Sequence, residues 1–376
     1  MPSESKIRRK LIDYPKMKIK FPRTALALLS LIMPLAAAAQ DAGGIKLTDK
    51  VKIGGTIRGK YEYQTSDKKG RFEVRTARVN VSGDINPYVA YKAEIDLCDE
   101  GTIKMLDAYA MLRPWKTLKF TIGQMRVPFT IDAHRSPDQQ YFANRSFIAK
   151  QVGNVRDVGA RLGYTFNVGF PIIVEAGLYN GSGLTNQKDF WTNEINFSAK
   201  TQILLPIGLD VVLSAQKVKP EDVSVMMYDA GMTFHKKGFI AEAEYLYKHY
   251  DKGAFRPVHA FDGFVSYDIP LRRCLFSKIS PLVRYDFMTD HSDGKRYTVS
   301  SDATGGDAAT TDDETKGKLI VNDYKRSRIT GGVTLSLDKP FMSDIRVNYE
   351  KYFYGHDGIP KTSEKDKIVV EFMVHF

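Results

Sequence analysis

After residue 51 the chain alternates apolar and polar side chains with a period of two along most of its length. Residues 367–376 show the pattern most clearly, because every even position is apolar while Lys367, Glu371 and His375 occupy odd positions. Successive side chains of a strand point to opposite faces. The pattern therefore predicts strands with one apolar face and one polar face, the last of which ends on Phe376.

The same alternation divides residues 51–376 into about sixteen segments of about ten residues each. In the first of them Ile53 and Ile57 share one face, whereas Arg58 and Lys60 share the other. The second segment changes phase near Thr76, where one additional residue would restore the alternation. We therefore expect a β-bulge at that point.

The connections between these segments are of two kinds, and the two kinds alternate along the chain. The short ones contain proline or glycine: Asn86-Pro87, Arg113-Pro114-Trp115, Phe170-Pro171, Leu205-Pro206, Lys236-Lys237-Gly238 and Asp338-Lys339-Pro340. The longer ones are polar: 64–70, 127–156, 180–192, 217–224, 289–325 and 355–366. Short turns on one rim and long loops on the other are typical of bacterial outer-membrane barrels.

We therefore predict an all-β fold, a transmembrane antiparallel β-barrel of about sixteen strands spanning residues 51–376. A charge on a lipid-facing position costs roughly 2–4 kcal/mol at the membrane midplane, so insertion requires the observed separation of charged and apolar faces. A soluble sandwich or secreted adhesin would also alternate. It would usually lack the terminal Phe, the aromatic side chains at strand ends and the unequal loops.

The N-terminal part of the chain predicts export rather than fold. We interpret residues 1–39 as an N-terminal extension and signal peptide. Met17 is a candidate for the true start, because a basic stretch, an apolar core from Thr24 to Leu35 and a small-residue cleavage site follow it. Residues 40–50 form a short periplasmic lead. We expect the mature chain to reside in the bacterial outer membrane, with outer-membrane lipid as a partner.

Composition narrows the function further. The 376 residues carry a formal charge of +11, but the first 39 hold eight Lys or Arg against two acidic residues, which leaves about +5 for the remainder. This balance gives no indication of nucleic-acid binding. Cys98 and Cys274 fall near opposite rims of the predicted barrel and are expected to be unpaired.

Several motifs resemble the phosphate-selective porin O and P family. They are Asp107-Ala108-Tyr109, Gly123-Gln124-Met125-Arg126-Val127-Pro128-Phe129, Asn144-Arg145-Ser146, Arg156-Asp157-Val158-Gly159, Asn180-Gly181-Ser182-Gly183 and Arg284-Tyr285-Asp286. The resemblance implies a sixteen-stranded homotrimeric porin whose third outer loop folds into the lumen. It also implies passive diffusion of small anionic solutes such as phosphate. Here the third long connection is 127–156.

Basic side chains supply the candidate chemistry, since arginine forks match phosphate oxygens and constriction charges set selectivity. The wall candidates are Arg58, Lys60, Arg75, Arg284 and Arg328, and those in or beside the third loop are Arg126, Arg135, Arg145, Lys150 and Arg156. Carboxylates share the same lumen face, so ion pairs that only brace the barrel remain an alternative. A weak general anion preference, or entry of larger anionic nutrients, is also left open.

Other functions have less support in the sequence. A surface adhesion or binding protein on a closed barrel, using the 289–325 loop, is the main alternative. An enzyme is not expected, because the seven histidines form no metal-ligand spacing and only His249 lies at a mildly suggestive place near a rim. The acidic stretch from Asp302 to Glu314 lacks the register of a calcium loop. No cofactor and no metal are predicted.

Overall fold

The computed structural model describes residues 45–48, 51–99, 101–152, 155–184, 190–219, 223–272, 275–290, 325–337, 341–355 and 364–376. The predicted leader, the greater part of the 289–325 loop, the Asp338-Lys339-Pro340 turn and Cys274 lie outside these residues. Cys98 is a free thiol. No helix in the described ranges is long and apolar enough to cross a membrane.

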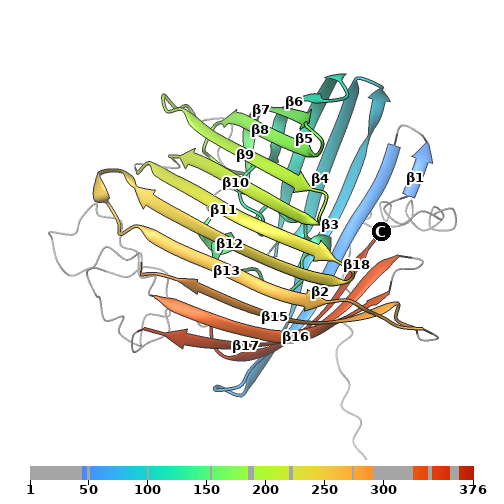
Figure 1. Ribbon diagram of the computed structural model, residues 1–376, viewed down its shortest axis with the longest axis vertical. Coiled ribbons are helices and arrows are strands. Elements are labelled where there is room, and N and C mark those ends of the chain that lie inside the picture. Colours follow the sequence, from blue (N-terminus) through green and yellow to red (C-terminus); the bar gives the residue numbers. More distant parts are fainter. Residues whose placement is uncertain are drawn as a thin grey trace, which may run out of the picture. The chain divides into compact units, whose positions relative to one another are not determined.

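The described strands form one antiparallel sheet that closes on itself (Figure 1). Two strands are short, β1 (Ile45–Thr48) and β14 (Ile269–Pro270), and they extend the edges of longer neighbours. The other sixteen are β2 (Val51–Gln64), β3 (Lys69–Asn86), β4 (Val89–Asp99), β5 (Thr102–Trp115), β6 (Leu118–Arg126), β7 (Arg156–Asn167), β8 (Pro171–Tyr179), β9 (Asn196–Leu205), β10 (Leu209–Val218), β11 (Val225–Lys236), β12 (Phe239–Tyr250), β13 (Val258–Tyr267), β15 (Lys278–Met288), β16 (Arg326–Leu337), β17 (Met342–Tyr354) and β18 (Lys367–His375). The predicted sixteen-stranded barrel is confirmed.

The barrel closes where β18 pairs with β2. Gly55 donates its backbone N–H to the carbonyl of Phe376 (2.8 Å), and Phe376 donates in return to the carbonyl of Gly55 (3.0 Å). A Cβ atom at position 55 would lie 2.5 Å from a ring atom of Phe376, so only glycine allows this close approach. The terminal aromatic ring therefore covers the seam.

The two faces of the barrel differ as the alternation predicts. On β2 and β18 the outer face exposes Ile57 (51%) and Phe372 (54%), whereas Arg58 and Glu371 on the inner face are buried. The predicted bulge is present, because Arg58 pairs with Thr76 and the next residue of β2 pairs with Val74, which leaves residue 75 as the additional one.

Two predicted connections are wrong in position. The 64–70 connection is not a long loop, because β2 extends to Gln64 and β3 begins at Lys69. Its charged residues fit a strand because the lumen face accepts them: Arg71 donates to the carboxylate of Glu62 at 2.7 Å. The Arg113-Pro114-Trp115 turn also lies later, at residues 116–117, because an irregular register between Leu112 and Trp115 accommodates the proline without a ladder hydrogen bond.

Residues 127–155, which connect β6 to β7, contain the 3-10 turn η2 (Pro137–Gln139) and the short helix α2 (Phe147–Gln151). Ser146 caps α2 by accepting a hydrogen bond from the backbone N–H of Ala149. Met125, Phe147 and Ile148 are almost fully buried and pack with inward-facing apolar residues of the barrel, among them Met227, Leu246, Val258 and Met288. This packing fixes the connection, called the 127–155 loop below, against the inner face.

Candidate functional site

Lumen-facing side chains satisfy the backbone of the 127–155 loop at several places. Thr130 donates its N–H to Ser214 Oγ on β10 (3.0 Å), Ala143 donates to Asn348 Oδ1 on β17 (2.9 Å), and Phe147 donates to Asp286 Oδ2 on β15 (3.0 Å). An irregular segment inside a barrel needs such partners because unsatisfied buried N–H groups are costly. The loop therefore lies across the inner surface of strands that are distant from it in the sequence.

Aromatic side chains of the 127–155 loop pack on the barrel wall. Phe142 meets the ring of Phe264 on β13 edge to face at 5.5 Å between centroids. Phe147 lies beneath two guanidinium groups of β16, with Arg326 4.8 Å and Arg328 4.9 Å from its centroid. Cation–π contacts of this kind strengthen when water is excluded.

Four of the five predicted wall candidates hold this loop. Arg328 is fully buried, contacts Asp286 at 2.7 Å and Glu350 at 3.3 Å, and donates to the carbonyl of Arg145 at 2.8 Å. Arg58 donates to Glu371 at 2.9 Å and to the carbonyl of Ala143 at 2.8 Å.

The other two behave in the same way. Lys60 lies 3.0 Å from Glu62 and donates to Asn144 Oδ1 at 3.1 Å. Arg284 donates to the carbonyl of Asn144 at 3.1 Å and stacks over Phe142. All four cations contact residues 140–145 from the barrel wall. These contacts fit the alternative in which the charges only brace the barrel, and we do not propose the four residues as solute ligands.

Arg126 and Arg145 differ from the other candidates. Arg126 donates to the carbonyls of His134 (2.8 Å) and Arg135 (2.9 Å). Arg145 donates to the carbonyls of Asp132 and Arg135, the latter at 2.7 Å. Two guanidinium groups thus converge on one carbonyl oxygen. Among the described residues neither forms an ion pair within 4.0 Å, so their charges stay uncompensated at short range.

The remaining candidates are paired with acids. Arg135 contacts Glu242 at 2.6 Å, and Lys150 contacts Glu364 at 3.0 Å. Arg156 contacts Glu94 on β4 and Asp107 on β5 at 3.1 and 2.7 Å. Arg75 lies 3.9 Å from Glu73, and its side chain is 37% exposed.

The lumen-facing wall is unequally covered. On β15–β18 and β2 the charged side chains are nearly all buried, whereas on β3, β4, β7 and β8 several keep part of their surface free. Lys92 is 27% exposed, Arg78 16% and Arg161 14%. From these exposures we infer that solutes pass between the 127–155 loop and the β3–β8 side. Toward the short-turn rim a 290 Å³ cavity opens beside Tyr141 and Arg346.

Burial and neighbouring charges shift the pKa values of several loop residues. Burial, followed by repulsion from Arg58, Arg78 and Arg135, lowers the pKa of Arg145 to about 10 although Asp132 opposes the shift, so the group stays charged at neutral pH. Burial raises the pKa of Asp132, but Arg145 and Arg135 outweigh it, and the pKa ends below its usual range. Burial and the nearby cations hold the pKa of His134 well below 6.5.

Sequence reasoning did not single out Asp132. Its carboxylate accepts hydrogen bonds from the backbone N–H of Ser146 (3.0 Å) and from Ser146 Oγ (2.8 Å), and lies 3.5 Å from Arg135. It joins the two halves of the loop and so places Arg145 beside Arg126. The only available signal was an acidic residue within a basic loop. His249, the suggestive histidine, stacks on Tyr228 and Tyr247.

Comparison with known proteins decides the class of the molecule. Residues 51–200 match the phosphate-selective porin O and P family. The resemblance to this porin family is confirmed. The motifs that carry it include the β6 strand, the 127–155 loop and the start of β7, so the matched segment contains both Arg126 and Arg145. No curated protein sequence matches the chain.

Solved porin structures share the fold of this porin at low sequence identity. OmpF of Salmonella typhi has a TM-score of 0.59 and 13% identity, covering 87% of this chain and 98% of its own. The anion-selective porin of Comamonas acidovorans has a TM-score of 0.54 and 11% identity, covering 87% and 99%. The trimer form of OmpT of Vibrio cholerae has a TM-score of 0.55 and 13% identity, covering 89% and 99%.

These findings bear on function at a coarse level. The porin is an outer-membrane channel for small solutes. Family and fold point to a channel rather than to an enzyme.

Proposed function

We propose that this porin passes small hydrophilic solutes with a bias toward anions, and that Arg126 and Arg145 set the bias. One observation carries the proposal: two guanidinium groups share the carbonyl of Arg135 and, in the described part of the chain, have no carboxylate within 4.0 Å. Fixed charges at a narrow place replace part of the solute's hydration, so two positive charges that no carboxylate contacts directly favour anions.

The solute class is proposed from the same pair. Guanidinium forks match the oxygens of phosphates and carboxylates and bind them bidentately when desolvated. Both side chains are largely buried but keep part of their surface exposed, and both are also restrained by carbonyl acceptors. Binding to such a site is weak and permits exit, as conduction requires. We therefore propose small oxyanions, phosphate included, and expect acidic groups such as Glu73 and Glu175 on the facing wall to keep selectivity incomplete.

We further propose that the porin is a homotrimer in the outer membrane. Support comes from a structural neighbour, the OmpT barrel, which is described in a trimer form.

Solute uptake by proteoliposomes tests the proposal. Purified wild-type porin is compared with the Arg126→Gln/Arg145→Gln double variant for gluconate, glucose and glucosamine, which are similar in size but differ in charge. We expect the wild type to admit gluconate fastest and glucosamine slowest, and the double variant to lose most of this order. Arg256→Gln is the matched control, since Arg256 is exposed in the β12–β13 connection. The same order of uptake rates in wild type and double variant would refute the assignment of the anion bias to Arg126 and Arg145.

A further inference from the structure

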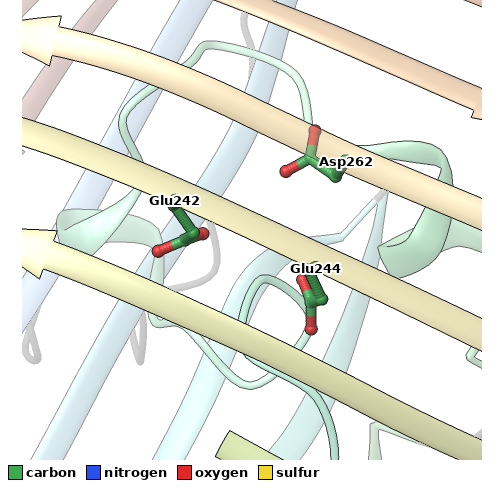
Figure 2. Close-up of side chains that lie close together, drawn as sticks. All are labelled: Glu242, Glu244 and Asp262. Carbon is green, nitrogen blue, oxygen red and sulfur yellow. The ribbon is translucent and has the colours of Figure 1, made fainter. Parts of the chain in front are cut away.

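Three acidic side chains gather on the lumen face of β12 and β13 (Figure 2). Glu242 and Glu244 are two residues apart on β12 and so share a face, and Asp262 on β13 is the direct cross-strand partner of Glu244. One carboxylate oxygen of each lies within 4.8 Å of the others. All three side chains are at most 4% exposed. Like charges directly opposite each other destabilise a sheet, and burial strengthens their repulsion.

Neighbouring cations compensate this cluster only in part. Glu242 accepts a hydrogen bond from Arg135 at 2.6 Å, but Arg135 also faces Asp132. In the described part of the chain, the cationic atom nearest to Asp262 is Arg284 Nε at 3.7 Å, a separation too long for a hydrogen bond. Arg284 in turn faces Asp286, which is the cross-strand partner of Asp262 on its other side. The acids therefore outnumber the positive charges that reach them.

Two carboxylate oxygens in the cluster have no hydrogen-bond partner among the residues described. Glu242 Oε1 and Asp262 Oδ1 are both buried and accept no hydrogen bond from any residue that the structure describes. The whole Asp262 side chain, only 2% exposed, receives none within the described chain. Buried carboxylate oxygens are normally satisfied, by protein groups, water or a bound ion. These atoms are a second indication of a ligand, independent of the clustering itself.

We propose that Glu242, Glu244 and Asp262 bind a divalent cation, for which calcium fits best. A point equidistant from three atoms 4.8 Å apart lies about 2.8 Å from each, slightly beyond the roughly 2.3–2.6 Å of calcium–oxygen bonds. Magnesium requires about 2.0–2.1 Å and strict octahedral geometry, so it would need a larger contraction. Carboxylate oxygens are the ligands that hard cations prefer.

The site would also stabilise the loop beside it. Glu244 accepts hydrogen bonds from the backbone N–H groups of Ile131 and Asp132, and Glu242 holds Arg135. A cation that relieves repulsion within the cluster therefore strengthens the attachment of residues 131–135. These residues supply the carbonyl acceptors of Arg126 and Arg145. Calcium would in this way stiffen the loop without contacting the solute.

Calcium binding to the purified, refolded porin tests the inference. Chelator-treated wild type and Asp262→Asn are compared by equilibrium dialysis with radioactive calcium. Their unfolding temperatures, at which the band of the folded barrel disappears from a denaturing gel, are measured with and without calcium. Asp262→Asn keeps the side-chain shape and breaks no hydrogen bond of the described structure. Glu175→Gln is the matched control, because Glu175 is a lumen carboxylate on β8 that pairs with Arg161 at 3.5 Å.

We expect wild type and Glu175→Gln each to bind one calcium ion at this site. Asp262→Asn should bind calcium there at least ten-fold more weakly. Calcium should raise the unfolding temperature of wild type and Glu175→Gln but not that of Asp262→Asn. Glu242→Gln, which keeps an oxygen acceptor for Arg135, should repeat the loss if Asp262→Asn fails to fold. Equal binding by wild type and variants would overturn the proposal. So would an Asp262→Asn porin that is more stable than the wild type by the same margin in calcium as in chelator, since protons and not calcium would then neutralise the cluster of the wild type.

Discussion

Arg145 is the residue at which the selectivity argument is most exposed to test. Its guanidinium is held by two carbonyl oxygens and, among the described residues, by no carboxylate within 4.0 Å. Replacing it with glutamine removes one positive charge that no carboxylate contacts directly. Arg145→Lys keeps the charge and loses only the fork, so the pair of variants separates electrostatics from shape.

The expected magnitude follows from Coulomb's law. An ion about 4 Å from the charge gains or loses about 1 kcal/mol even at the dielectric constant of water. Anions lose this much and cations gain it, which makes a difference of about 2 kcal/mol between them. Because about 1.4 kcal/mol corresponds to ten-fold, Arg145→Gln should lower the anion-to-cation permeability ratio roughly ten- to thirty-fold at low salt.

Reversal potentials of single channels in a potassium chloride gradient measure this ratio. The effect should be largest near 10 mM salt and nearly absent near 1 M, where the screening length falls from about 30 to about 3 Å. Arg145→Lys should retain most of the wild-type ratio. A ratio that is the same for Arg145→Gln and wild type at low salt, with normal conductance, would refute the reasoning.

Three further predictions concern the scaffold. Arg328→Met leaves Asp286 and Glu350 buried without their partner and should lower the free energy of unfolding, measured in urea, by about 3–5 kcal/mol. Arg75→Met, at a part-exposed site, should lower it by less than about 1 kcal/mol. Similar losses for the two variants would contradict the bracing role of Arg328. Gly55→Val places a Cβ atom 2.5 Å from a ring atom of Phe376 and should sharply reduce the yield of heat-modifiable barrel; a normal yield would show that the seam tolerates a side chain. Because the pKa of His134 lies well below 6.5, this side chain stays neutral from pH 8 to pH 6.5. The anion-to-cation permeability ratio should therefore not change between these pH values. Only below pH 6.5 does the unfolded loop bind a proton at His134 that the folded loop excludes, and this destabilises the folded loop. A change of selectivity near pH 7 that His134→Gln removes would contradict the burial of His134.

The barrel was predictable because lipid imposes a strict rule on one face of every strand. Ile57 and Phe372 face outward, Arg58 and Glu371 face inward, and the phase change marks the bulge at residue 75. Exact turn positions were less predictable. Lumen strands accept charge, so polarity alone does not show where a strand ends.

The division of labour among basic residues could not be predicted from the sequence. All ten candidates look equivalent there, because which arginine meets a carboxylate depends on contacts between residues far apart in the chain. Arg328 meets Asp286 and Arg58 meets Glu371 across neighbouring strands, whereas Arg145 meets only carbonyls of its own loop among the described residues. Asp132 was missed for the same reason.

Thiol accessibility tests most directly the claim that solutes pass between the 127–155 loop and the β3–β8 side. In a background with Cys98→Ser and Cys274→Ser, cysteine is placed at Ser82, a half-buried lumen position of β3, or at Ser198, which is fully buried under Pro128. An anionic methanethiosulfonate reagent should react rapidly with the residue 82 variant, reduce its conductance and lower its anion selectivity, and leave the residue 198 variant unchanged. Rapid reaction at residue 198 with none at residue 82 would contradict the account.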